Sequence, residues 1–317
     1  VSKNKFYYSE WGIYTNYADY GTYSENLFIA PSDNYGSTFA VQSSDYNKIE
    51  NNSFYGVYYG LSLHEDSSYN EFWFNTLDYS SNTWGTSGYG HQGLQFSSNS
   101  RNNLAYGNNI SHYSEGIRLL CTVHSCENNV VKNNIVDDSE YGITLHLNAA
   151  SNVIIDNVVK NSETYGIYIK ASASNNTISN NIVEEGSTTG MYVAGSNNII
   201  TNNTIKDSGD TGIIISGDSN IVQYNNITGN GYGLNSSSSV DARYNWWGNK
   251  SGPSGAGPGN GDSINNATLI TFSPWLCDPS GQIPIEYCEE ESEDPIAYWK
   301  FDDGSGTNAY DSSGNSN

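Results

Sequence analysis

A glycine followed by a mostly apolar strand recurs throughout this chain. The repeat glycines are Gly12, Gly36, Gly60, Gly93, Gly116, Gly142, Gly166, Gly190, Gly212 and Gly233. Their spacings are 24, 24, 33, 23, 26, 24, 24, 22 and 21 residues. A steady period in this range is typical of a solenoid, in which each coil buries its apolar face against its neighbours.

Each repeat contains three short strands. After the glycine, inward apolar residues alternate with variable ones, as in Gly142-Ile143-Thr144-Leu145. Two further apolar runs follow, separated by Asn-rich turns, and no long helical pattern occurs. We therefore predict an all-β fold, a right-handed three-sheet parallel β-helix of about ten coils with a C-terminal cap. An antiparallel sandwich also has many short strands, but it would not hold glycine and asparagine in register over ten repeats.

The asparagine pairs have a physical role in this fold. Asparagine tolerates left-handed backbone angles, and its side chain bonds the backbone in turns. Asparagines stacked from coil to coil can also hydrogen-bond along the axis as ladders.

The repeat predicts four segments. Residues 1–240 form the coils, 241–277 a cap, 278–295 an acidic linker and 296–317 a segment too short to be a domain. A solenoid must cover its last apolar layer. The candidates for this cover are Trp246, Trp247 and Trp275. The start at Val1, directly in coil-like sequence, leads us to expect a piece of a longer chain.

Charge narrows the choice of partner. The chain has 12 Lys and Arg against 34 Asp and Glu, a net charge of −22. No basic patch could neutralise phosphates, so nucleic acid is excluded as a partner. Calcium is the one cofactor that these carboxylates could bind, although no dense calcium loop is present. No segment is apolar enough to span a membrane.

The cysteines and glycosylation motifs indicate an oxidising compartment. Cys121 and Cys126 lie within one coil, and Cys277 and Cys288 bracket a segment near the C-terminus, so we predict two local disulfides. Candidate glycosylation sites are Asn109, Asn202, Asn226, Asn249 and Asn266. We expect an extracellular or cell-surface protein.

The coils and their ending resemble those of a known group of proteins. The ending comprises Tyr244-Asn245-Trp246-Trp247-Gly248, Ser251-Gly252-Pro253 and Ser273-Pro274-Trp275-Leu276. Residues 12 to 276 resemble the pectin-lyase-like parallel β-helix repeats of archaeal and bacterial surface proteins. These include periplasmic proteins of copper and nitrous oxide metabolism and disaggregatase-related proteins of methanogens. Residues 296–317 resemble the start of a laminin-G-like jelly roll, a domain that typically binds carbohydrate.

One face of the predicted helix could carry a site. Outward positions after the glycines place Arg118, His146 and Lys170 on three adjacent coils. Lyases that open uronic polymers need a base and a cation beside the substrate carboxylate. Lys170 or His146 could be the base and Arg118 the cation, or the three polar residues could share a face by chance. Candidate sugar contacts are Tyr141, Tyr165, Tyr168, Tyr192 and, on an inserted loop, Trp84 and Tyr89.

Other chemistries fit less well. A hydrolase needs two carboxylates facing a groove, but the pairs Asp137-Asp138 and Glu184-Glu185 fall in turns. Gly90-His91-Gln92-Gly93 precedes the aspartate pair instead of following it, unlike the polygalacturonase pattern. A zinc site would need a chance meeting of the histidines His64, His91, His112, His124 and His146.

Three functions remain open. The first is a rigid surface that binds a glycan or neighbouring surface proteins. The second is a polysaccharide lyase or other carbohydrate-active enzyme on an acidic glycan. The third is a subunit of an extracellular filament or sheath, formed by self-assembly.

Overall fold

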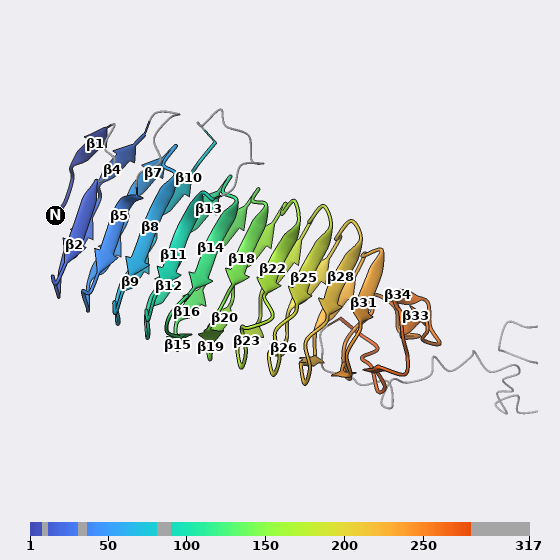
Figure 1. The fold of residues 1–317 in the computed structure, drawn as a ribbon. Helices are drawn as coiled ribbons and strands as arrows, with labels where there is room; N and C mark the ends of the chain where they lie inside the picture. The colour runs from blue at the N-terminus through green and yellow to red at the C-terminus, as the bar shows by residue number, and fades with distance from the viewer. Residues whose placement is uncertain (8–11, 31–36, 81–89, 280–317) are drawn as a thin grey trace, which may run out of the picture.

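The computed structural model describes residues 1–7, 12–30, 37–80 and 90–279, with only the backbone of residues 37 and 38. They form the predicted right-handed parallel β-helix, whose coils follow one another from the blue N-terminal end to the orange C-terminal end (Figure 1). As far as residue 228, every coil contributes one strand to each of three parallel sheets. No helix occurs in these ranges, so no described helix could cross a membrane.

The first sheet has ten strands. In spatial order they are β1 (Lys5–Tyr7), β4 (Leu27–Ile29), β7 (Ser53–Tyr55), β10 (Thr76–Asp78), β13 (Asn109–Ser111), β17 (Ile135–Asp137), β21 (Val158–Lys160), β24 (Ile182–Glu184), β27 (Thr204–Lys206) and β30 (Asn226–Thr228).

The second sheet has twelve strands and carries the repeat glycines from Gly60 to Gly233. They are β2 (Ile13–Asn16), β5 (Ser37–Gln42), β8 (Tyr59–His64), β11 (Gln92–Ser97), β14 (Glu115–Leu120), β18 (Tyr141–Leu145), β22 (Tyr165–Ile169), β25 (Thr189–Val193), β28 (Thr211–Ile215), β31 (Tyr232–Ser236), β34 (Gly261–Ile264) and β33 (Pro253–Gly255).

The third sheet has eleven strands. They are β3 (Thr22–Ser24), β6 (Lys48–Glu50), β9 (Glu71–Trp73), β12 (Leu104–Tyr106), β16 (Val130–Lys132), β20 (Val153–Ile155), β23 (Thr177–Ser179), β26 (Ile199–Thr201), β29 (Ile221–Gln223), β32 (Val240–Asp241) and β35 (Ile270–Thr271). A separate pair joins β15 (Cys126–Glu127) and β19 (Ala149–Ala150).

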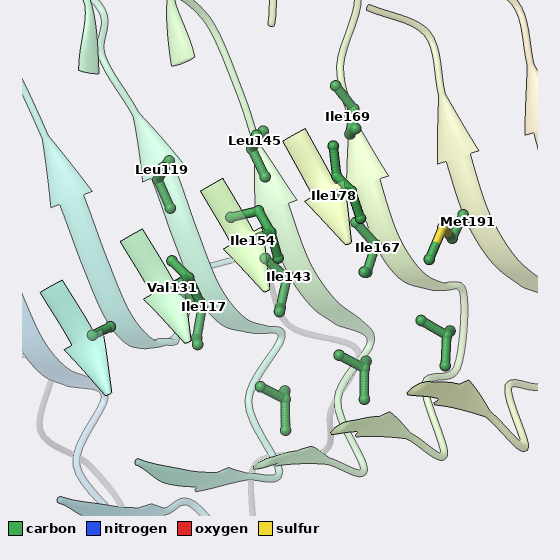
Figure 2. Close-up of a cluster of buried hydrophobic side chains, with 14 of the residues drawn as sticks. Ile117, Leu119, Val131, Ile143, Leu145, Ile154, Ile167, Ile169, Ile178 and Met191 are labelled. Atoms are coloured by element: carbon green, nitrogen blue, oxygen red, sulfur yellow. The ribbon is translucent and has the colours of Figure 1, made fainter. Parts of the chain in front are cut away.

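The core is a column of aliphatic side chains stacked along the axis. Ile117 pairs in register with Ile143, and Ile143 with Ile167. All three are fully buried, and the third sheet faces them with Val131 and Ile154 (Figure 2). Burying an aliphatic side chain of this size contributes roughly 1.5–3 kcal/mol, so each coil is stabilised mainly by the two coils beside it.

The repeat glycine is needed because two backbones approach closely. A Cβ on Gly142 would lie 2.3 Å from Cγ1 of Val159 and 2.5 Å from the carbonyl oxygen of Gly166. Neither atom is at the end of a long flexible side chain. The glycine therefore lets the second sheet pack onto the first.

The predicted register is wrong at Gly36. Phe39 pairs with both Ile13 and Leu61, so Thr38 occupies the position that the pattern assigned to Gly36. In the observed register the buried side chains of Phe39 and Val41 lie in line with Leu61 and Leu63 of the next coil, whereas the predicted register would put Ser37 in the place of Phe39.

Two buried asparagine ladders run along the axis, as the sequence predicts. In one ladder, Asn108 donates from Nδ2 and from its backbone N–H to Oδ1 of Asn134, both at 2.9 Å. Asn134 repeats this with Asn157 and also donates to the carbonyl oxygen of Ala105. The side chains thus satisfy turn backbone groups that are buried away from water.

The segment 241–277 both covers and extends the coils. Trp247 is fully buried in the core, and Trp275 packs against the core while donating from Nε1 to the carbonyl oxygen of Lys250. β34 and β35 add strands to the second and third sheets, which the prediction of a separate cap did not include.

Cys121 and Cys126 form a disulfide. Cys277 is also disulfide-bonded, but its expected partner Cys288 lies outside the described residues. So do nearly all of the acidic linker, from residue 280, and the whole segment 296–317.

Candidate functional site

A cavity of about 560 Å³ opens on the outer face of the second sheet. It spans four coils, from β11 to β22. Its lining residues are Gly90, Gln92, Ser114, Glu115, Arg118, Glu140, Tyr141, His146, Glu163, Thr164 and Lys170. The three residues proposed from the sequence as a catalytic group, Arg118, His146 and Lys170, all line it.

Strand register explains how these three side chains meet. Arg118 pairs with Thr144 of the next coil. The backbone N–H of His146 donates to the carbonyl of Leu119, and that of Lys170 to the carbonyl of Leu145. His146 and Lys170 therefore occupy the same position in consecutive coils, two residues beyond the row of Arg118.

Glu115 is the central residue of the cavity, and the sequence analysis missed it. Its Oε1 lies 3.0 Å from Nε2 of His146, and its Oε2 lies 3.0 Å from Nε of Arg118. The Arg118 N–H is not aimed at the carboxylate, so that contact is an ion pair without a hydrogen bond. Thr144 donates from Oγ1 to Oε2 at 3.3 Å.

These contacts determine the ionisation of Glu115. Burial raises the pKa of its carboxyl group, but the hydrogen bond from His146 and the positive charges of Arg118 and Lys170 outweigh burial and leave the pKa below its usual value. Glu115 is therefore a carboxylate at neutral pH, and it accepts hydrogen bonds from His146 and Thr144.

His146 is neutral and its tautomer is fixed. Burial lowers its pKa, and the opposing effect of Glu115 is smaller. A carboxylate can only accept a hydrogen bond, so Nε2 carries the hydrogen and Nδ1 the lone pair. Nδ1 has no hydrogen bond to any residue that the structure describes, although the side chain is only 9% exposed. A lone pair held in this way is suited to accept a proton from a bound molecule.

Two cations of the cavity have nitrogens that form no ion pair with a described residue. Nζ of Lys170 lies 5.3 Å from the ring centroid of Tyr168 and has no described carboxylate within 4.0 Å. Burial lowers the pKa of Lys170. Arg118 pairs through Nε alone, which leaves its terminal nitrogens without an ion pair in the described part of the chain. An anionic group of a ligand could form ion pairs with both Arg118 and Lys170.

Carboxylates lie at the other side of the cavity. Glu140 comes just before β18 and Glu163 just before β22. Burial raises the pKa of Glu140, and the charges of Glu163 and Glu115 raise it further, against a hydrogen bond from Tyr141. Within the described ranges, the charges that act on Glu140 are those of Glu163 and Glu115, and neither is a cation.

The four predicted tyrosines form one cluster at the C-terminal side of the cavity. The rings of Tyr168 and Tyr192 stack at 5.2 Å with planes 4° apart, and Tyr165 stands edge-to-face with both. Tyr141 lies tilted against Tyr165 and stacked on Tyr168. Because Tyr168 and Tyr192 turn their faces toward each other, they offer a glycan mainly ring edges and hydroxyls.

The remaining predicted residues lie elsewhere. Asp137 pairs with Lys160 at 3.1 Å and Glu184 with Lys206 at 2.8 Å on the first sheet. His91 is buried, stacks on Tyr79 and accepts a hydrogen bond from the backbone N–H of Ser114. Trp84 and Tyr89 are outside the described residues. Of the glycosylation candidates, Asn109 and Asn202 are exposed, and Asn226, Asn249 and Asn266 are partly buried.

The fold and the cavity define a parallel β-helix protein with a polar groove on its glycine-bearing sheet. Residues 1–88 and 85–246 match the family described as periplasmic copper-binding protein (NosD), and the chain belongs to this family. No curated protein matches the sequence closely enough to count as a relative.

Solved structures with the same fold include carbohydrate-related proteins. The periplasmic alginate epimerase AlgG is 16% identical with a TM-score of 0.53, and the match covers 70% of this chain and 59% of AlgG. The Dettilon tailspike protein is 13% identical with a TM-score of 0.61, and the match covers 85% of this chain and 63% of the tailspike protein. The A-module of Azotobacter vinelandii mannuronan C-5 epimerase AlgE4 is 12% identical with a TM-score of 0.57, and the match covers 87% of this chain and 79% of the module. The match thus spans less than two thirds of AlgG and of the tailspike protein, and identities this low show the fold alone.

The described residues do not fit a copper site. Copper is held in proteins by histidine nitrogen and by cysteine or methionine sulfur. In the described ranges no three His, Cys, Asp or Glu side chains are grouped to hold a metal ion. Cys121 and Cys126 are joined in a disulfide, and the single methionine, Met191, is buried in the core.

Proposed function

We propose that this chain is a glycan-binding protein located outside the cytoplasm, and that the glycan lies in the cavity of the second sheet. The observation that carries the proposal is the pair of cations, Arg118 and Lys170, that face the cavity with incomplete anionic partners. The chain has only 12 Lys and Arg, so two such cations in one cavity are notable.

The tyrosine cluster supports the same conclusion. Tyrosine combines an apolar ring with a hydroxyl, which suits it to a wet interface with a sugar. Tyr141 lines the cavity, and Tyr165, Tyr168 and Tyr192 continue from it along the axis. The matching family is described as periplasmic, and AlgG is a periplasmic epimerase, which supports a location outside the cytoplasm. The alginate and mannuronan epimerases among the structural neighbours support a glycan as ligand.

Titration calorimetry with a panel of acidic and neutral polysaccharides tests this function. We expect an acidic glycan to bind and Lys170→Gln to weaken it about tenfold, as for the loss of one charged hydrogen bond. Lys206→Gln removes the same charge from the first sheet and should leave the affinity unchanged. Equal affinities for Lys170→Gln and wild-type protein would disprove the role of the cavity.

The free lone pair of His146 favours a second candidate, a lyase or related enzyme. His146 Nδ1 would take the proton α to a uronate carboxylate, Arg118 would neutralise that carboxylate, and Glu115 would orient the imidazole. A lyase creates a conjugated double bond, so absorbance at 235 nm would rise with a polyuronate and stay flat with His146→Gln. No rise across the panel would leave binding as the function.

A further inference from the structure

The charges of the cavity are divided between its two sides. Glu140 and Glu163 precede the glycines of their coils, whereas Arg118 and Lys170 follow theirs. Lys170 interacts electrostatically with Glu115 and Arg118, and Glu140 with Glu163 and Glu115. Glu115, which also precedes its glycine, pairs with Arg118, whereas Lys170 and Glu140 form no ion pair with any residue that the structure describes.

The strand geometry explains this division. Gly116 and Ile117 are both buried between the outward side chains of Glu115 and Arg118, so the alternation of inward and outward residues is broken at the glycine. The residues before and after the glycine can then face one cavity from two sides. The next coils repeat this arrangement, with Tyr141 and Tyr165 in register with Glu115.

A ligand with only one kind of charge would pair either with the cations of the cavity or with its carboxylates, but not with both. A uronate carboxylate could bind Lys170 and Arg118, but Glu140 would still have no cationic partner among the described residues. A protonated amine would supply that cation and form a charge-assisted hydrogen bond. His146 is nearly buried, lines the same cavity and has no described partner at Nδ1, so it could accept a third hydrogen bond.

We propose that the glycan of this cavity is zwitterionic, with a carboxylate bound by Arg118 and Lys170 and a free amino group bound by Glu140. This inference rests on the proposed glycan-binding function and specifies its ligand. The chemical class is a polymer in which uronic acid alternates with an unsubstituted hexosamine.

The test compares three polymers by calorimetry on the whole chain. Two have the same uronic acid–hexosamine backbone, N-acetylated in one and de-N-acetylated in the other, and the third is a de-N-acetylated hexosamine homopolymer without carboxylates. We expect the de-N-acetylated mixed polymer to bind about tenfold more tightly than either of the others. Glu140→Gln should remove this preference, and the control Glu185→Gln, at an exposed position outside the cavity, should retain it.

Three alternative results would each overturn the inference in a distinct way. Equal affinity for the two mixed polymers, weakened in both by Lys170→Gln, would preserve glycan binding and exclude the amine. Tight binding of the homopolymer, weakened equally by Glu140→Gln and Glu185→Gln, would show nonspecific attraction to the net charge. A preference for the N-acetylated form that requires added calcium and Glu140 would assign the carboxylates to a cation instead.

Discussion

Glu115 Oε1 lies 3.0 Å from Nε2 of His146, and the two residues belong to neighbouring coils, 31 positions apart in the sequence. This contact sets the tautomer of His146 and holds its ring in the cavity. It depends on the solenoid, because only the stacking of β14 on β18 brings the two side chains together.

Removal of the Glu115 charge should change the titration of His146. Glu115 raises the pKa of His146 against the larger lowering by burial, so Glu115→Gln should lower that pKa further. An NMR titration of the imidazole Cε1–H signal measures it. Glu140→Gln is the matched control, because Glu140 is not among the groups that act on His146. A raised or unchanged pKa in Glu115→Gln would contradict the described contact.

His91 should make the protein sensitive to mild acid. Burial lowers the pKa of His91 from 6.5 to about 4 in the folded state. As pH falls below 6.5, the unfolded chain takes up a proton that folded His91 does not. Stability is therefore fully present above pH 6.5 and is lost as pH falls toward 4, by up to about 3 kcal/mol.

Urea denaturation from pH 7 to 4 measures this effect. His91→Gln should flatten the loss, whereas His124→Gln, at an exposed position, should retain the wild-type profile. Parallel profiles for wild-type protein and His91→Gln would show that another group causes the acid sensitivity.

A methyl group at the repeat glycine should disrupt the packing between sheets. In Gly142→Ala the new Cβ would overlap Val159 and the backbone of Gly166, which is expected to cost about 3 kcal/mol or more. Gly186→Ala is the control, since the nearest atom to its Cβ would be 3.6 Å away. The melting temperatures of the two variants provide the comparison, and similar values would contradict the close approach.

Loss of one ladder asparagine should be costly. Asn134→Ala would leave the backbone N–H of Asn108 and the carbonyl of Ala105 buried without partners. Each such group costs about 1–3 kcal/mol, so we expect a loss of about 3 kcal/mol in the free energy of unfolding. The exposed strand residue Asn109 provides the control, and Asn109→Ala should change the free energy of unfolding little. Equal effects of the two substitutions would argue against the ladder as a source of stability.

The sequence was sufficient to predict the fold because the glycine, the asparagines and the apolar residues repeat together. It was also sufficient to place Arg118, His146 and Lys170 on one face of three adjacent coils, because register in a parallel solenoid follows from position in the repeat. At Gly36 the same reasoning was wrong, since the buried side chains of Phe39 and Val41 decided the register there.

The sequence analysis did not select Glu115 as a site residue because of the local strand geometry. Strict alternation places Glu115 and Arg118 on opposite faces, and only the two consecutive buried residues at Gly116 and Ile117 bring them to one face. A signal was present, because Tyr141 and Tyr165 also directly precede a repeat glycine and were proposed as outward residues. The carboxylate in the same row could have been selected by the same argument.

The most direct test of the account is a crystal structure of the protein with the polysaccharide that binds most tightly. The account predicts a sugar carboxylate within hydrogen-bond distance of Arg118 and Lys170, with the chain continuing over Tyr168 and Tyr192. A glycan bound on the first or third sheet, with the cavity of the second sheet empty, would contradict it.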